Sequence, residues 1–132
     1  MLINRGTALA LCALALAGCA QVPDCNRVGG TPMLEYQLYF GRAAVTDQQW
    51  ADFTAKVVTP NLPDGFTAFD AYGQWMNPDT HKISQERTKV IVVAEPDTPM
   101  TRTAIAQIKD EYRQRFHQIS VGTAILPACG AF

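Results

Sequence analysis

Two extended arms joined by a polar turn occupy the middle of the chain and limit the folds open to it. Residues 65–76 and 83–94 alternate in the manner of β-strands, and residues 77–82, Asn-Pro-Asp-Thr-His-Lys, have the composition of a turn. Apolar residues concentrate in 90–94, whereas polar residues dominate both sides near the turn. We therefore expect a hairpin with a buried base and a tip that projects beyond the core.

A strand and a helix are predicted before this hairpin. Residues 34–40 alternate between an apolar side and a polar side, as a half-buried strand does. Thr46 followed by Gln49 is a capping-box pattern that opens a helix, and Pro60 closes it. The apolar positions of this helix recur at helical spacing at Trp50, Phe53 and Val57.

A second helix and a last strand are predicted after the hairpin. Thr101 is the expected N-cap of the helix, and residues 119–126 are rich in β-branched side chains and precede Pro127, which should stop the strand. The apolar face of the helix consists of Ile105, Ile108, Tyr112 and Phe116.

The resulting element order is strand, helix, strand, strand, helix, strand. This is the pattern of the ferredoxin-like α+β fold, in which two helices cover one face of a single antiparallel sheet. We expect this fold over residues 34–132.

The first residues have the features of an export signal. Arg5 supplies a positive start, and residues 8–16 are an apolar stretch too short to cross a bilayer as a helix. The stretch ends in Leu16-Ala17-Gly18-Cys19, which resembles the lipobox of bacterial lipoproteins. An ordinary secretory signal cut near Ala20 is the alternative.

The lipobox resemblance implies that residues 1–18 are removed and that Cys19 carries a diacylglycerol and an N-acyl chain such as palmitate. Several acyl chains give stable anchoring. Because Ala20, and not Asp, follows Cys19, the resemblance implies the outer membrane of a diderm host, with the protein facing the periplasm. Residues 19–33 are then a tether between membrane and domain.

This interpretation leaves two cysteines for the domain, Cys25 and Cys129. In the expected fold the start of the first strand lies beside the end of the last strand, which brings both thiols toward one corner. An oxidising compartment allows them to pair. We expect a disulfide, and two free thiols are the alternative.

Composition excludes several classes of function. A chain of 132 residues has room for one core, and its formal net charge of −1 gives no electrostatic reason to expect nucleic acid. His81 and His117 have no partners at ligand spacing, and no glycine-rich phosphate loop occurs. We therefore expect neither a metal nor a cofactor.

Several short stretches, taken together, are typical of one family. They are Leu38-Tyr39-Phe40-Gly41-Arg42, Val45-Thr46-Asp47 with Trp50 and Phe53, Thr59-Pro60, Pro63-Asp64-Gly65-Phe66-Thr67, Gly73-Gln74-Trp75, and Glu86 with Lys89. They resemble the bacterial family known as domain of unknown function 3574, and the resemblance covers most of the chain after the tether. It implies an exported, often lipoprotein-like protein, and it implies no activity.

Polar residues of the predicted sheet supply the candidate site. If the apolar side of residues 34–40 faces the helices, Glu35, Gln37 and Tyr39 face outward. We expect the hairpin to add further polar residues to this outer face, namely Asp70, Tyr72, Gln74, Arg87 and Lys89. Three interpretations stay open: a solvated face with cross-strand charge pairs, a homodimer face, and a small-molecule site.

Three further residues have two interpretations each. Arg42 either exposes its guanidinium for a carboxylate or phosphate, or forms a salt bridge with Asp47. Glu86 is either a buried acid or the partner of an arginine. Trp75 either stacks on a ligand or lies in a core or an interface.

We predict a non-enzymatic binding or interaction module, acting alone or as a homodimer. The alternative is a cofactor-independent enzyme that uses the open sheet face, by analogy with oxygenases and isomerases of the dimeric α/β-barrel type. The ligand-binding candidates are Tyr39, Arg42, Asp70, Gln74, Trp75, Glu86, Arg87 and Lys89.

Overall fold

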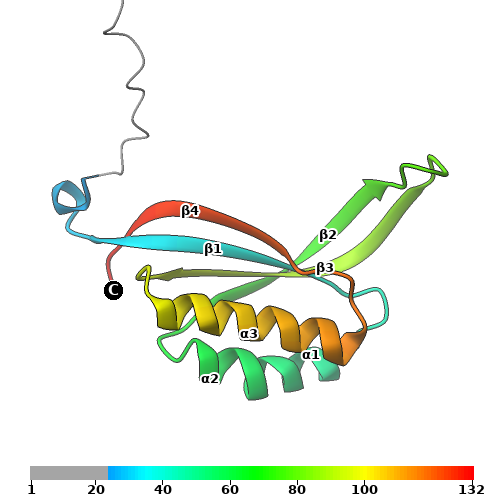
Figure 1. The fold of residues 1–132 in the computed structure, drawn as a ribbon, viewed down its shortest axis with the longest axis horizontal. Helices are drawn as coiled ribbons and strands as arrows, with labels where there is room; N and C mark the ends of the chain where they lie inside the picture. The colour runs from blue at the N-terminus through cyan, green and yellow to red at the C-terminus, as the bar shows by residue number, and fades with distance from the viewer. Residues whose placement is uncertain (1–23) are drawn as a thin grey trace, which may run out of the picture.

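The computed structural model describes residues 24–132, which form one sheet with helices packed against one of its faces (Figure 1). The predicted signal peptide and the lipidation site at Cys19 lie outside the described residues. None of the helices in residues 24–132 combines the length and apolar character that a membrane crossing needs.

Four strands make the sheet, in the order β2-β3-β1-β4, and every neighbouring pair is antiparallel. The strands are β1 (Thr31–Gly41), β2 (Thr67–Met76), β3 (Ile83–Glu95) and β4 (Gly122–Gly130). The predicted α+β architecture, with one antiparallel sheet and two helical segments, is confirmed.

The first helical segment begins as predicted. Thr46 caps it, accepting from the backbone N–H of Gln49 while the Gln49 side chain accepts from Thr46 N–H. The segment then runs without interruption through α1 (Asp47–Phe53), the π-helical turn η2 (Thr54–Val58) and α2 (Thr59–Asn61).

The second helix, α3 (Pro99–Phe116), starts earlier than predicted. Its N-cap is Thr98, whose hydroxyl accepts from Thr101 N–H, so the assignment of Thr101 as N-cap was wrong. The physical reason is that proline fits the first helical position, where its missing N–H is not needed.

The last strand also differs from its prediction. It runs through Pro127, which pairs with Leu34, and was expected to stop there. A proline is tolerated in β4 because this strand is at the sheet edge and pairs only with β1.

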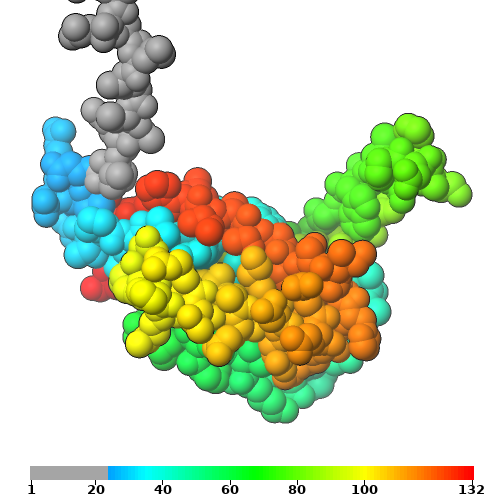
Figure 2. Space-filling model, in the orientation of Figure 1, coloured from blue at the N-terminus to red at the C-terminus, as the bar shows by residue number. Residues whose placement is uncertain are grey.

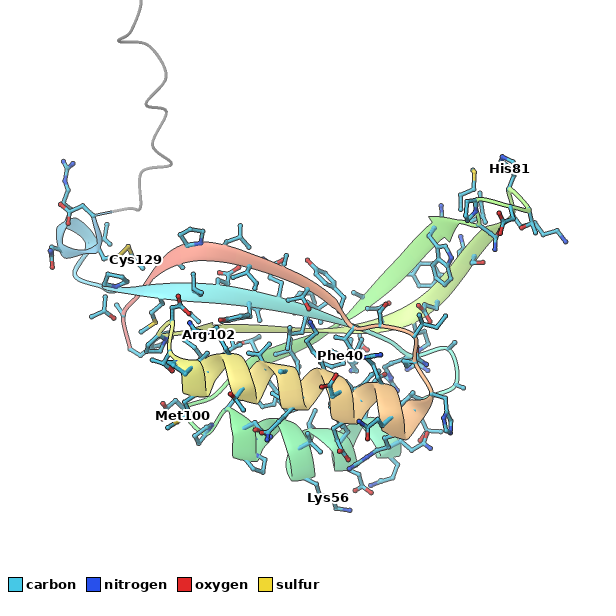
Figure 3. All side chains as sticks on the ribbon, viewed as in Figure 1. Phe40, Lys56, His81, Met100, Arg102 and Cys129 are labelled. Atoms are coloured by element: carbon cyan, nitrogen blue, oxygen red, sulfur yellow. A yellow bond between two sulfur atoms is a disulfide. The ribbon has the colours of Figure 1, made fainter. Side chains whose placement is uncertain are left out.

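The core is an aromatic cluster between the sheet and the helices. Phe40, from β1, lies with its ring centroid 5.3 Å from that of Trp50 and 4.8 Å from that of Tyr112. Phe53 joins the same rings, and Phe40, Phe53 and Tyr112 are fully buried. Figure 3 shows Phe40 between the sheet and the helix layer.

The predicted disulfide is present. Cys25 and Cys129 are bonded, with their Cα atoms 5.3 Å apart. Cys25 lies in the short helix η1 (Cys25–Val28), which immediately precedes β1. The first strand, β1, begins at Thr31, before the expected residue 34.

The hairpin divides into a base and an arm, as predicted. β3 pairs with both β1 and β2 up to Thr88, opposite Gly41, whereas its earlier residues pair with β2 alone. Residues 72–87 therefore form a two-stranded ribbon, which we call the arm. Figures 1 and 2 show the arm projecting from the body and rising on the side of the sheet away from the helices.

Candidate functional site

Arg42 is the centre of an ion-pair network at the base of the arm. Its side chain has no exposed surface. One guanidinium nitrogen, Nη2, lies 2.6 Å from Asp47 Oδ1 and 3.0 Å from the carbonyl oxygen of Val45. The predicted salt bridge with Asp47 is confirmed, and the alternative of an exposed guanidinium is wrong because the Arg42 side chain is buried.

The same network includes the base of the hairpin. Asp47 also accepts from Arg87 Nη2 at 3.1 Å, and Lys89 Nζ lies 2.8 Å from Asp70 Oδ1. A hydrogen bond and the positive charge of Arg42 hold the pKa of Asp47 below its usual range. A hydrogen bond from Lys89 lowers the pKa of Asp70. Both carboxylates therefore remain charged over a wide pH range, and they link β1, α1 and the hairpin.

The network does not satisfy all of its donors. Nε and Nη1 of Arg42 are buried without a hydrogen-bond partner, and Nη1 is 3.8 Å from Asp70 Oδ1, too far for a hydrogen bond. Because the Asp47 and Asp70 carboxylates are largely exposed while the guanidinium is enclosed, a solute reaches the carboxylates and not the arginine. The arrangement orients the hairpin base and leaves no open anion site.

The strand register corrects the predicted outer face. Tyr39 lies opposite Val90, and Val90 lies opposite Phe69, so these three share one face. Phe40, Lys89 and Asp70 are likewise opposite one another, on the helix-covered face. The hairpin residues expected beside Tyr39 are thus on the other side of the sheet: Asp70, Tyr72, Gln74, Arg87 and Lys89. A one-residue difference in register reverses the face of every side chain.

The open face carries an apolar row and a polar ladder. The row Tyr39–Val90–Phe69 crosses three strands; Phe69 is 48% exposed and Tyr39 is 38% exposed, and they flank the buried Val90. Along β1, Tyr39 Oη donates to Gln37 Oε1 and Gln37 Nε2 donates to Glu35 Oε1, each at 2.7 Å.

Glu86 and Trp75 lie on the open-face side of the hairpin. A Cβ built on Gly41 would stand 2.6 Å from Glu86 Oε1, so the carboxylate lies directly over this glycine. Within residues 24–132 no cationic side chain is at ion-pair distance from Glu86, which argues against its predicted pairing with an arginine. Trp75 is on the arm and half exposed, outside the core.

The other side of the arm is polar with exposed apolar ends. Gln85 Nε2 donates to Gln74 Oε1 at 2.5 Å, and Tyr72 Oη donates to Gln85 Oε1 at 2.9 Å. Met76 and Ile83, next to the turn, are 58% and 59% exposed. Gln74 therefore stabilises the ribbon through a cross-strand contact and has no contact with Asp70 or Arg42 in the ion-pair network.

A groove of about 730 Å³ lies at the end of the sheet opposite the arm. Its apolar lining comes mainly from Met33, Phe66, Val92, Ala94 and Phe132. The described residues that line it also include the carboxylates of Glu35, Asp64 and Glu95, and no lysine or arginine. Partial burial, and then the charge of Asp64, raises the pKa of Glu95. No local sequence pattern indicates this groove, because its lining comes from four separate segments of the chain.

Seven of the eight candidate residues divide into two sets, and Gln74 belongs to neither because it contacts Gln85 on the arm. Arg42, Asp70, Arg87 and Lys89 meet in the ion-pair network, whereas Tyr39, Glu86 and Trp75 lie on the open-face side. Within residues 24–132 no three His, Cys, Asp or Glu side chains are grouped to hold a metal ion.

Comparison with known families assigns the chain. Residues 35–132 match the family described as a protein of unknown function, DUF3574. The chain belongs to the DUF3574 family. A comparison with curated proteins finds no match.

Among solved structures, this DUF3574 domain is similar to a phage SAM lyase in complex with S-methyl-5'-thioadenosine. The TM-score is 0.55 at 14% identity, over 71% of this chain and 80% of the lyase chain. An amidase of the hydantoinase/carbamoylase family from Burkholderia multivorans aligns at a TM-score of 0.30 and 13% identity, over 74% of this chain and 27% of that chain. At 14% identity the likeness to the lyase concerns the fold alone.

The stretches that resemble DUF3574 meet in space. Phe40, Trp50 and Phe53 form the aromatic core, and Arg42, Asp47 and Lys89 form the network beside it. Gly41 leaves room for the Glu86 carboxylate. Much of the resemblance is thus explained by the core and ion-pair contacts that connect the hairpin to β1 and α1.

Proposed function

We propose that this DUF3574 protein is a lipid-anchored envelope protein whose ferredoxin-like domain acts as a non-enzymatic interaction module. Its partner is a second copy of the chain, bound through the open sheet face. The domain is held at the periplasmic side of the outer membrane by the lipid on Cys19.

One observation carries the proposal: the apolar row Tyr39–Val90–Phe69 crosses the uncovered face of the sheet. Apolar and aromatic side chains that are exposed in one patch are typical of an interface. The ionisable candidates do not favour catalysis, because most of them neutralise one another in the network around Arg42. The face itself is short of charge, since Glu35 and Glu86 are its only charged side chains among the described strands.

The pairing is tested on the exported domain with Cys19→Ala, which removes the lipid. Sedimentation equilibrium over a range of concentrations should show a monomer–dimer equilibrium. Phe69→Glu should raise the dissociation constant at least tenfold, because it places a charge in the apolar row of the interface. The matched control is Gln114→Glu, on the helix layer, which should leave it unchanged. A wild-type domain that stays monomeric at every concentration would overturn the proposal.

The anchor is tested separately by cell fractionation. Wild-type protein should sediment with membranes, and the Cys19→Ala variant should be released into the soluble fraction. Soluble wild-type protein would show that the anchor is wrong, without bearing on the interface.

A further inference from the structure

The arm exposes apolar side chains on both of its faces. Two-stranded hairpins are marginally stable in water on their own. On the arm, Trp75 is 49% exposed on one face, and Met76 and Ile83 are exposed on the other face. No other segment of residues 24–132 covers the outer half of the arm (Figure 2). The arm is therefore suited to burial against a partner.

The acidic apolar groove lies at the opposite end of the molecule. Figure 3 shows His81 at the tip of the arm and Cys129 at the far end. The groove offers the apolar surface of Phe66 and Val92 and the carboxylates of Asp64 and Glu95. The turn of the arm ends in exposed Lys82, next to Ile83. Arm and groove are thus complementary in apolar character. The turn carries both Asp79 and Lys82, and Lys82 is the residue whose charge is opposite to that of the groove.

A two-fold axis along the apolar row brings these two features together. Rotation about this axis reverses the direction of the strands. A residue on one side of the row therefore lies over a residue of the second copy that is equally far from the row on its other side. Trp75 pairs with Ser84 of β3, and Ser84 is six residues before Val90 on that strand. Six residues beyond Val90 is Pro96, which lines the groove. The arm rises on the open-face side, toward the second copy (Figure 1).

We propose that two copies clasp each other, with the arm of each seated in the acidic apolar groove of the other. This inference rests on the proposed pairing of open faces. It adds the contact between arm and groove, which sets the relative orientation of the two copies. Trp75 covers the apolar floor of the groove, and Lys82 lies near Asp64 and Glu95 of the other copy.

Thiol cross-linking in the Cys19→Ala domain tests the contact. One variant carries Trp75→Cys with Ala94→Cys, and a second carries Phe69→Cys alone. Within one chain Trp75 and Ala94 are about ten strand residues apart, or ~33 Å. A bifunctional thiol reagent much shorter than this span can join them only between copies. The Phe69→Cys variant tests the face-to-face pairing alone, because position 69 of one copy should be linked to position 69 of the other.

If the clasp is correct, each variant should give cross-linked dimers. Peptide mapping of the first variant should show position 75 linked to position 94. Self-linking at position 69 without a 75–94 link would overturn the clasp and leave the face-to-face pairing intact. A 75–75 link from Trp75→Cys alone would also overturn it, because it shows arms paired side by side. Failure of all links in a monomeric protein would remove the proposed function as well.

A binding measurement supplies the second test. Trp75→Ala should raise the dimer dissociation constant at least tenfold, as loss of a buried tryptophan at an interface does. Tyr72→Ala is the matched control, since Tyr72 is on the same arm but on its other face. The clasp is wrong if the two variants weaken the dimer equally or if neither does.

Discussion

Tyr112 gives the sharpest test of the packing between the helices and the sheet. Its side chain has no exposed surface, and its ring lies among Phe40, Phe53 and Phe116. The phenol donates a hydrogen bond of 2.7 Å to the carbonyl oxygen of Gly41, where β1 ends. Burial raises the pKa of Tyr112 to about 12, although the positive charge of Arg42 acts in the opposite direction. We predict how Tyr112→Phe changes the pH dependence of stability.

The sign and size follow from linkage. Because the folded protein holds the phenolic proton more tightly than the unfolded chain, Tyr112 stabilises fully below pH 10.0, the ordinary pKa. This stabilisation is lost as the pH rises toward about 12. A shift of two units corresponds to about 2–3 kcal/mol. Tyr112→Phe removes this alkaline loss, but it costs about 1 kcal/mol at neutral pH because the Gly41 carbonyl loses its donor.

The measurement is urea unfolding of both proteins, with the disulfide intact, at several pH values between 7 and 12. The difference between their free energies of unfolding isolates Tyr112, since other titrating groups are common to both. The wild type should be more stable near pH 7, and the variant more stable near pH 12. A difference that stays constant across this range would refute the account of the buried phenol.

Three further predictions concern stability. Replacing Cys25 and Cys129 together by Ser opens a bridge across 104 residues and should lower the free energy of unfolding by about 4–5 kcal/mol on the chain-entropy model; a loss below about 1 kcal/mol in urea titrations would contradict it. Asp70→Asn should reduce the acid sensitivity, because Lys89 lowers the pKa of Asp70 and the wild type loses this contribution as the pH falls below 3.8; parallel acid-unfolding curves would argue against it. Phe53→Ala should cost about 3–5 kcal/mol, since the ring is fully buried, and an unchanged thermal midpoint would contradict this.

Local patterns predicted the elements well. The turn at residues 77–82, the capping box at Thr46 and the better burial of the hairpin base around residues 90–94 follow from composition and alternation, which act over a few residues. The disulfide followed from element order, because Cys25 precedes β1 and Cys129 is near the end of β4, which pairs with β1. The predicted start of α3 and the predicted end of β4 were wrong, and both involve a proline. Proline is tolerated at the first position of a helix and on an edge strand, because its missing N–H is not needed at either place.

The candidate site was predicted less well. Arg42 and Asp47 are close in sequence, and their pairing followed from this. The groove at Phe66 and Val92 brings together segments that are far apart along the chain, so no local pattern indicates it.

The sequence by itself determined the strands, the helices, the family and the division of the hairpin into a buried base and a projecting arm, because these depend on periodicity within each segment. Only the tertiary structure decided which hairpin residues face the helices. Pairing Tyr39 with Val90 directs Phe69 to the open face and Asp70 to the other. Alternation within a strand is compatible with either choice, and the register between strands selects one by burying Phe40 and Ile91 together against the helices.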